Sequence, residues 1–197
     1  MLIGTRWAWR SLIGGIVALA LVLSLVGVSS ARANENWTAQ TSGTTNHLVG
    51  VAVDSAGNWT AVGATGTILT SSDNGITWTA QTSGTANTLR GVAVDSSGNW
   101  TAVGATGTIL TSSDNGITWT AQTSGTANFL RSVAVDSAGN WTAVGNSGTI
   151  LTSSDNGVTW TPQTSGTANI LIGVTADSAG NWTAVGNSGT ILTSSDN

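Results

Sequence analysis

The residues of this chain that could act as general acids or bases are mostly aspartates in repeated positions. Eight of the nine acidic residues are aspartates, and they fall into two series with a spacing of 41 residues within each series. The series are Asp54, Asp95, Asp136 and Asp177, and Asp73, Asp114, Asp155 and Asp196. A glycosidase needs two carboxyl groups in different environments, so that one of them stays protonated. Because the members of a series occupy copies of the same turn, we expect neither series to provide such a pair.

The other residue types exclude further chemistry. The chain has no cysteine and no tyrosine, and His47 is its only histidine. Without cysteine there is no disulfide, no thiolate metal site and no cysteine nucleophile. We therefore predict that the protein is not an enzyme, binds no cofactor and holds no metal. One alternative for a metal stays open. The side chains of Asp54, Asp95, Asp136 and Asp177 could surround one mouth of a central channel and hold Ca²⁺. Aspartates in such positions more often cap turns.

The first 33 residues have the pattern of an export signal. Arg6 and Arg10 precede an apolar run over residues 11–28, and Ala31 and Ala33 provide small residues at the expected cleavage site. We predict a signal peptide over 1–33 and a mature chain over 34–197, secreted or located in the periplasm or a lumen. An uncleaved membrane anchor is the alternative, because an apolar run of this length is borderline for spanning a bilayer.

Removal of this segment would leave a strongly acidic chain. The formal net charge changes from −4 to −7 when Arg6, Arg10 and Arg32 are lost, and Arg90 and Arg131 remain as the only arginines. Two cations cannot neutralise a nucleic-acid backbone or form a polybasic patch for anionic lipids. We expect no nucleic-acid partner and no membrane insertion after cleavage.

A 41-residue unit is repeated four times between residues 34 and 197. Each unit contains four short stretches rich in β-branched and aromatic residues, separated by clusters of Gly, Asn, Asp and Ser. In the first full unit the strands are expected near residues 48–53, 59–62, 67–71 and 77–81. The pattern predicts an all-β fold, a β-propeller of four-stranded antiparallel blades. A parallel β-solenoid is the less favoured alternative, because its coils are usually shorter.

The turn before the last strand of each unit carries a family motif. The segment from Ser71 to Trp78 matches the pattern S-x-D-x-G-x-T-W of the Asp-box, or BNR repeat, and it recurs at 112–119 and 153–160. The chain over 34–197 resembles Asp-box β-propellers, and its blades are similar to those of the photosystem II stability and assembly factor family. The resemblance implies that the box is a structural hairpin between the third and fourth strands. Its residues are Ser71, Asp73, Gly75, Trp78, Ser112, Asp114, Gly116, Trp119, Ser153, Asp155, Gly157 and Trp160.

Sialidase activity is not implied by the motif. Sialidases of this architecture use a tyrosine nucleophile and three arginines, and the predicted mature chain has neither.

The two ends of the repeat region have complementary sequences. The segment 194–197 begins a fourth box, and Trp37–Gln40 has the sequence of a fourth strand. We expect this N-terminal strand to close the last blade, as in other propellers, which leaves no open sheet edge. A four-bladed monomer and a strand-swapped, eight-bladed dimer both satisfy this closure.

The units differ most from each other at two places, the entrance to the first strand and the loop between the second and third strands. In a propeller these segments open on one face, opposite the Asp-boxes, and variable loops on a fixed scaffold are typical of a binding face. Neutral drift of the repeats is the alternative. The candidate residues are His47, Val49, Thr88, Arg90, Phe129, Arg131, Ile170, Ile172, Asn146 and Asn187.

Three functions follow from these observations. The favoured one is a protein-binding or assembly scaffold, and the family resemblance implies a partner at a photosynthetic membrane. A lectin-like module is the alternative, with Phe129 or a tryptophan stacking on a glycan. A glycosidase or sialidase-like enzyme is disfavoured for the reasons given above.

Overall fold

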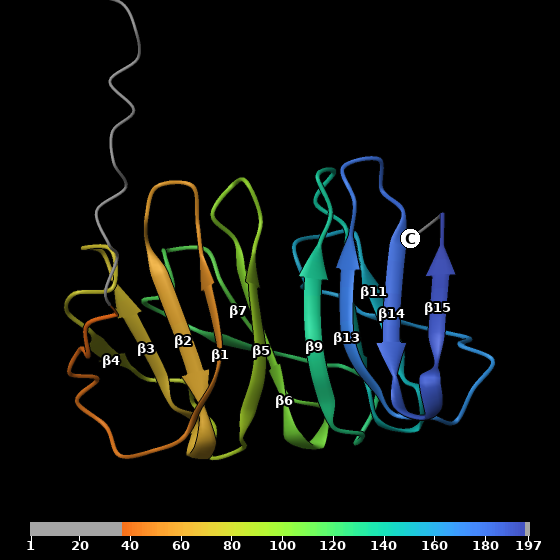
Figure 1. The fold of residues 1–197 in the computed structure, drawn as a ribbon, viewed down its shortest axis with the longest axis horizontal. Coiled ribbons are helices and arrows are strands. Elements are labelled where there is room, and N and C mark those ends of the chain that lie inside the picture. Colours follow the sequence, from red (N-terminus) through yellow and green to blue (C-terminus); the bar gives the residue numbers. More distant parts are fainter. Residues whose placement is uncertain (1–36, 196–197) are drawn as a thin grey trace, which may run out of the picture. The chain divides into compact units, whose positions relative to one another are not determined.

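The computed structural model describes residues 37–195 of the chain. The predicted signal peptide and its cleavage site lie outside these residues. Within them, fifteen strands form four antiparallel sheets, all in the compact unit that begins at Ala39 (Figure 1). No helix in this part of the chain has the length and hydropathy needed to cross a bilayer. We call each sheet with its turns a blade and number the blades in chain order.

The strands follow each other in the same order in every blade. The first blade contains β1 (Leu48–Val53), β2 (Trp59–Gly63), β3 (Ile68–Ser71) and β4 (Thr79–Gln81). The second contains β5 (Leu89–Val94), β6 (Trp100–Gly104), β7 (Ile109–Ser112) and β8 (Thr120–Gln122). The third contains β9 (Leu130–Val135), β10 (Trp141–Gly145), β11 (Ile150–Ser153) and β12 (Thr161–Gln163). The fourth contains β13 (Leu171–Ala176), β14 (Trp182–Gly186) and β15 (Ile191–Ser194). Between the second and third strands lie the short turns η1 (Ala64–Gly66), η2 (Ala105–Gly107), η3 (Asn146–Gly148) and η4 (Asn187–Gly189).

The repeated antiparallel sheets confirm the predicted fold class. The expected strands 48–53 and 59–62 match β1 and β2 closely, but β4 begins at Thr79 rather than at residue 77. The backbone N–H of Thr77 donates to the carboxylate of Asp73 (2.9 Å), so Thr77 still belongs to the turn. A side-chain bond to a turn thus shortens the outer strand.

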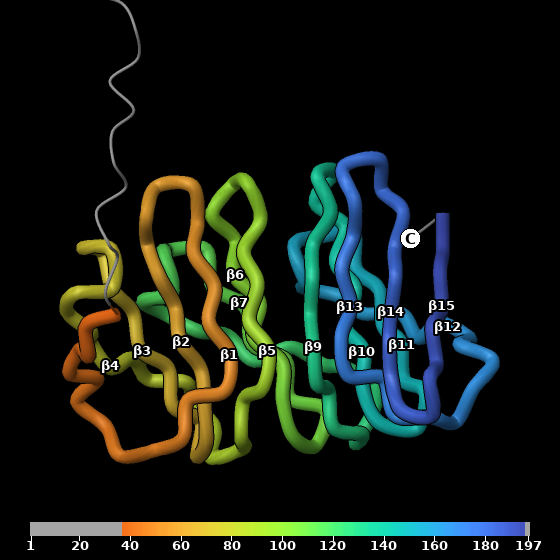
Figure 2. The backbone as a smooth tube through the Cα atoms, viewed as in Figure 1, coloured from red at the N-terminus to blue at the C-terminus, as the bar shows by residue number. Residues whose placement is uncertain are grey.

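The blades stack through their inner strands. β1, β5, β9 and β13 lie in a row, each packed against the next (Figures 1 and 2). Small residues make this approach possible. A Cβ on Gly50 would lie 2.9 Å from the carbonyl oxygen of Arg90, and one on Gly91 would lie 3.2 Å from the Cα of Ser132.

Hydrophobic residues fill the junction between each pair of neighbouring blades. At the first junction Val62 and Ile68 pack against Leu89, Ala102 and Leu110 of the next blade, and all five are buried. The middle blades are covered on both sides, so every residue of β6 and β10 is buried. Because both faces of these strands are buried, the sequence W-T-A-V-G does not alternate polar with apolar residues, and threonine is its only polar side chain.

The predicted closure of the last blade is not formed in this structure. The fourth sheet has the three strands β13, β14 and β15, and residues 37–47 form no strand. The reason is the course of the row. β1 packs against β5 and β13 packs against β9, but β1 and β13 do not pack against each other, so the row stays open between the first and last blades (Figure 1).

Candidate functional site

The Asp-box turns use their polar groups internally. In the second blade the carboxylate of Asp114 accepts hydrogen bonds from the backbone N–H of Thr118 (2.9 Å), its hydroxyl (2.6 Å) and the hydroxyl of Ser112 (2.8 Å). The indole N–H of Trp119 donates to the carbonyl oxygen of Gly116 (2.7 Å). The boxes at 71–78 and 153–160 repeat these bonds. The polar groups of the three boxes are thus bonded within their own turns.

The boxes also join neighbouring blades. A Cβ on Gly116 would lie 2.8 Å from the Oγ1 of Thr60 in the preceding blade, and one on Gly157 would lie 2.7 Å from the Oγ1 of Thr101. Both glycines have positive φ, so they are required for the turn as well as for the close approach. The boxes of the second and third blades therefore pack on the blade before them.

The hydrogen bonds of the boxes make stability depend on pH. The hydroxyl and N–H of Thr77 and the hydroxyl of Ser71 lower the pKa of Asp73 to about 2, from an ordinary value of 3.8. Burial raises the pKa of Asp114, but hydrogen bonds from Thr118 and Ser112 outweigh it, so that this pKa is lowered too. A lowered pKa in the folded state adds stability above the ordinary value, and this contribution is lost as pH falls towards the folded value.

We therefore expect the free energy of unfolding to be level from about pH 7 to 5 and to fall between about pH 4 and 2. Urea unfolding followed by tryptophan fluorescence over this range measures it. The substitution Asp73→Asn should make the fall less steep. A stability that rises on acidification, or an unchanged slope in the variant, would contradict the assignment.

The second aspartate series caps the turns between the first two strands. The Oδ1 atom of Asp54 accepts from the N–H groups of Ala56 (2.9 Å) and Asn58 (2.8 Å), and its Oδ2 atom accepts from the Asn58 side chain (2.8 Å). Asp95, Asp136 and Asp177 make equivalent bonds. Within residues 37–195, no three His, Asp or Glu side chains gather into a group that could hold an ion. The structure thus engages these carboxylates in their own turns and does not bring them together around Ca²⁺.

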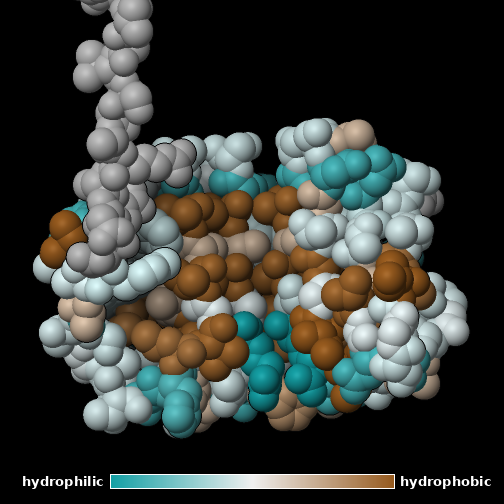
Figure 3. All heavy atoms as spheres, viewed as in Figure 1, coloured by the Kyte–Doolittle hydropathy of each residue, from teal (hydrophilic) through white to brown (hydrophobic). Residues whose placement is uncertain are grey.

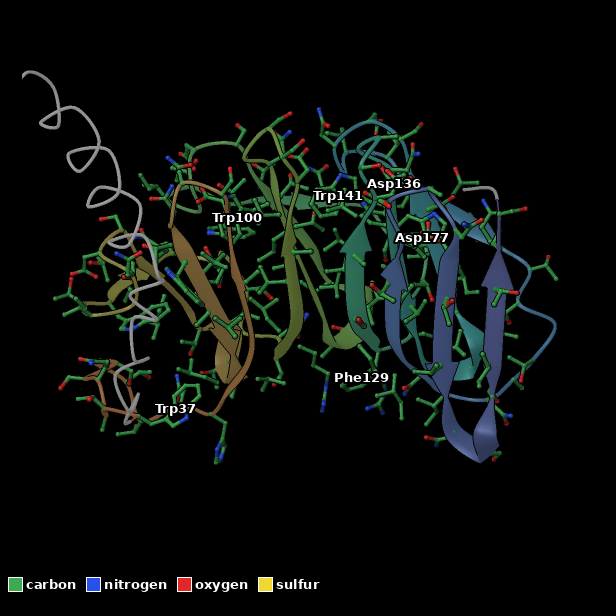
Figure 4. All side chains as sticks on the ribbon, turned by 45° about the horizontal axis from the view of Figure 1, so that its top comes forward. Trp37, Trp100, Phe129, Asp136, Trp141 and Asp177 are labelled. Carbon is green, nitrogen blue, oxygen red and sulfur yellow. The ribbon has the colours of Figure 1, made fainter. Side chains whose placement is uncertain are left out.

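The two variable segments meet at the opposite end of the blades. The N–H of Ala105 in η2 donates to the carbonyl oxygen of Thr88 (2.9 Å), and the N–H of Asn146 in η3 donates to that of Phe129 (2.8 Å). The same bond recurs in the other two blades. Phe129 lies at one end of the sheets and Asp136 and Asp177 at the other (Figure 4). The variable segments joined by these bonds therefore lie at the end of the sheets away from Asp136 and Asp177.

Neighbouring blades bring an arginine and an aromatic ring together at this end. The guanidinium carbon of Arg90 lies 5.8 Å from the centroid of the Phe129 ring, a cation–π distance. The Nε of Arg90 is buried and has no hydrogen-bond partner, whereas the Nε of Arg131 donates to the Oδ1 of Asn146 (2.7 Å). The ten candidate binding residues differ in burial. Five are partly buried, namely Thr88, Arg90, Arg131, Asn146 and Ile170, and five are exposed, namely His47, Val49, Phe129, Ile172 and Asn187. We call these ten residues the loop face.

Residues that the sequence analysis did not single out hold the loop face in shape. The side chain of Asn128 donates to the hydroxyl of Thr149 (2.8 Å), and Asn87 makes the same bond to Thr108. These bonds tie the entrance of an inner strand to the turn after the second strand. The signal for them was present in the sequence as an Asn that precedes a Thr by 21 residues in every unit.

A chain of four-stranded blades with Asp-boxes at one end and variable loops at the other is an Asp-box β-propeller. The chain belongs to the family described as photosynthesis system II assembly factor YCF48, whose family model matches residues 29–195. The predicted resemblance to this family is confirmed. No curated protein sequence matches the chain significantly.

Several solved structures have a similar fold. A structure described as YCF48 bound to D1 peptide has a TM-score of 0.67 at 20% identity, over 82% of this chain and 54% of that one. YCF48 from Cyanidioschyzon merolae has a TM-score of 0.62 at 19% identity, over 76% of this chain and 53% of that one. An ancestral GH74 enzyme has a TM-score of 0.61 at 15% identity, over 78% of this chain and 25% of that one. The chain thus spans about half the length of the two YCF48 structures, and the fold is shared with an enzyme as well as with assembly factors.

Proposed function

We propose that the protein is an exported, non-enzymatic assembly scaffold that binds an acidic segment of a protein partner on its loop face. Membership of the YCF48 family supports a role in assembly, and one YCF48 structure holds a D1 peptide. The pattern of residues 1–33 supports export. A partner at a photosynthetic membrane follows from the family in the same way.

The observation that carries the proposal is the environment of the Arg90 side chain. Its Nε is buried without a partner, and its guanidinium group lies beside the exposed ring of Phe129. The residue as a whole is only partly buried, and a carboxylate of a partner that approaches the terminal nitrogens of its guanidinium group would form charge-assisted hydrogen bonds with them. Arg131 lies at the equivalent position of the next blade and adds a second cation.

The distribution of charge supports an acidic segment. The carboxylates of the Asp-boxes and of the capped turns lie at the other end of the blades, away from the arginines. An acidic segment would therefore be attracted to the loop face and repelled from the opposite end. The aspartates take part in turn hydrogen bonds and lack the two distinct environments that a glycosidase needs, which supports a non-enzymatic role.

The experiment compares the chain with the double variant Arg90→Gln, Arg131→Gln. The wild-type chain is immobilised and used to capture partners from the native envelope fraction, and the affinity of the captured protein is then measured. Because hydrogen bonds to charged groups contribute about 1.5–3 kcal/mol, we expect the double variant to bind about 10–100-fold more weakly.

Ile117→Ala is the control, because Ile117 is exposed on an Asp-box turn at the other end of the blades, outside the loop face. It should bind like the wild type, and both proteins should unfold at the wild-type temperature. An unchanged affinity of the arginine variant would refute the proposed site. Elution of the captured partner by free glycan would instead favour a lectin, for which the exposed ring of Phe129 is the stacking surface.

A further inference from the structure

The junction between blades is one interface repeated three times. The earlier blade contributes a valine of its second strand and an isoleucine of its third, which are Val62 and Ile68, Val103 and Ile109, and Val144 and Ile150. The later blade contributes a leucine at the start of its inner strand, which is Leu89, Leu130 or Leu171, and all three leucines are fully buried. Each interior blade thus has two different sides, and each side fits the other side of a neighbour.

The two ends of the row expose these same residues. In the last blade Val185 and Ile191, the counterparts of Val62 and Ile68, are 44% and 69% exposed. In the first blade Leu48, the counterpart of Leu89, is 43% exposed. Figure 3 shows hydrophobic side chains at the surface over the first blade and again over the last one. The two exposed sides are therefore the two halves of one unformed junction.

A cavity marks a missing group at the third junction. At the first two junctions the tryptophan that ends an Asp-box, Trp119 or Trp160, packs into the hydrophobic cluster. Among the described residues no such tryptophan reaches the cluster of Val144, Leu171 and Ala184. A cavity of about 480 Å³ opens there, and Val144 and Ala184 line it.

The N-terminal segment has the sequence that would fit this cavity. Trp37–Gln40 reads W-T-A-Q, as does the stretch from Trp119 to Gln122. In the second blade this stretch places Trp119 in the junction, and its strand β8 pairs with β7 in the register Ile109 with Gln122, Leu110 with Ala121 and Thr111 with Thr120. If the fourth blade has the same register as the second, Ile191 should pair with Gln40, Leu192 with Ala39 and Thr193 with Thr38.

We propose that a second copy of this chain forms the missing junction. The first blade of one copy packs against β14 and β15 of the other, and its segment Trp37–Gln40 adds a fourth strand beside β15 with Trp37 in the cavity. Because the contact is made at both ends, two copies close a ring of eight blades, within the known range for propellers. A second copy is favoured over an unrelated protein, since the exposed residues match the three formed junctions position by position. It is favoured over closure within one chain, since β1 and β13 do not pack against each other in this structure.

The first test is the mass in solution. Light scattering on the purified chain, with its N-terminus determined by mass spectrometry, should give twice the mass of one chain. Ile191→Asp places a charge in the new junction and should raise the dissociation constant of the dimer at least about 100-fold. Ile76→Asp is the matched control, since Ile76 is 59% exposed on an Asp-box turn; it should stay dimeric. A wild-type mass of one chain would overturn the proposal.

A second test identifies the strand pair without disturbing the junction. Because the chain contains no cysteine, Thr38→Cys in one preparation and Thr193→Cys in another create a single pair of thiols when the two are mixed and oxidised. The proposal predicts a disulfide-linked pair of chains from the mixture and from the double variant. A double variant linked only within one chain would show a self-closed monomer, and the absence of any link would also refute the proposal.

Discussion

Replacing Gly107 with alanine should destabilise the protein by about 2–5 kcal/mol, enough to remove a large part of the stability of a domain of this size. Gly107 ends η2 with φ of 68°, and its N–H donates to the carbonyl oxygen of Asn128 (2.9 Å). A Cβ at this position would overlap the carbonyl oxygen of Thr126 and lie 2.7 Å from the Oγ of Ser124. The clash is with backbone that is itself hydrogen-bonded, so it cannot be relieved by rotation of a side chain.

Gly125→Ala is the control variant, because it carries the cost of the left-handed backbone conformation without the steric clash found at Gly107. Gly125 has φ of 71°, almost the same as Gly107, but no atom lies within 4 Å of its added Cβ. We expect this variant to lose only about 1–2 kcal/mol, the cost of the left-handed conformation itself. Urea unfolding of both variants gives the comparison. Equal losses at the two positions would show that η2 is not packed as described.

Trp141→Ala should lose about 3–5 kcal/mol of stability, the usual cost of removing a buried tryptophan. Trp141 is fully buried in the cluster at the second junction, together with Val103 and Leu130. Its indole N–H has no hydrogen-bond partner. Trp141→Phe should therefore cost much less than Trp141→Ala, because the ring still fills most of the space and no hydrogen bond is lost.

Trp59→Ala is the matched control for position in the row of blades. Trp59 occupies the same repeat position as Trp141 but belongs to the first blade and is only partly buried. In the Ile191→Asp background, in which the proposed dimer dissociates, we expect a loss of about half that of Trp141→Ala, because less surface returns to water. Calorimetric or urea unfolding measures both variants, and a larger loss at Trp59 would contradict the difference in packing between the blades.

The sequence predicted the elements of this fold because each unit specifies its own turns. Asp54 and its copies, and Asp73 and its copies, occur where the chain reverses, and local hydrogen bonds from these side chains are enough to place four strands per unit. The repeat then supplied the order of the blades. The same local chemistry also caused the error at β4, since the N–H of Thr77 bonds to Asp73 instead of joining the strand.

The sequence could not predict how units meet. The approach of Arg90 to Phe129 joins two blades, and the bond of Arg131 to Asn146 joins residues 15 positions apart. The first depends on the rotation of one blade relative to another, and the second depends on the exact path of a turn within the third blade. The predicted closing strand is absent from the structure for a related reason. Trp37–Gln40 has the right sequence, but whether its partner strand is within reach is decided by the accumulated curvature of four blades.

The graded burial of equivalent strands has a consequence for amide exchange with deuterated solvent. The sequence W-T-A-V-G is fully buried in β6 and β10 but partly exposed in β14. Stability in a row of repeats is approximately a sum of the units and of their neighbour contacts, so a terminal unit with one neighbour opens more readily than an interior one. In the single chain, obtained with the Ile191→Asp variant, these five identical residues should therefore exchange their amide hydrogens fastest in β14 and slowest in β6 and β10. In the proposed dimer the fourth blade gains a second neighbour, and the difference should become smaller. The effect of neighbouring blades on amide exchange can therefore be compared within one chain, because the peptide sequence is constant and only its place in the row varies.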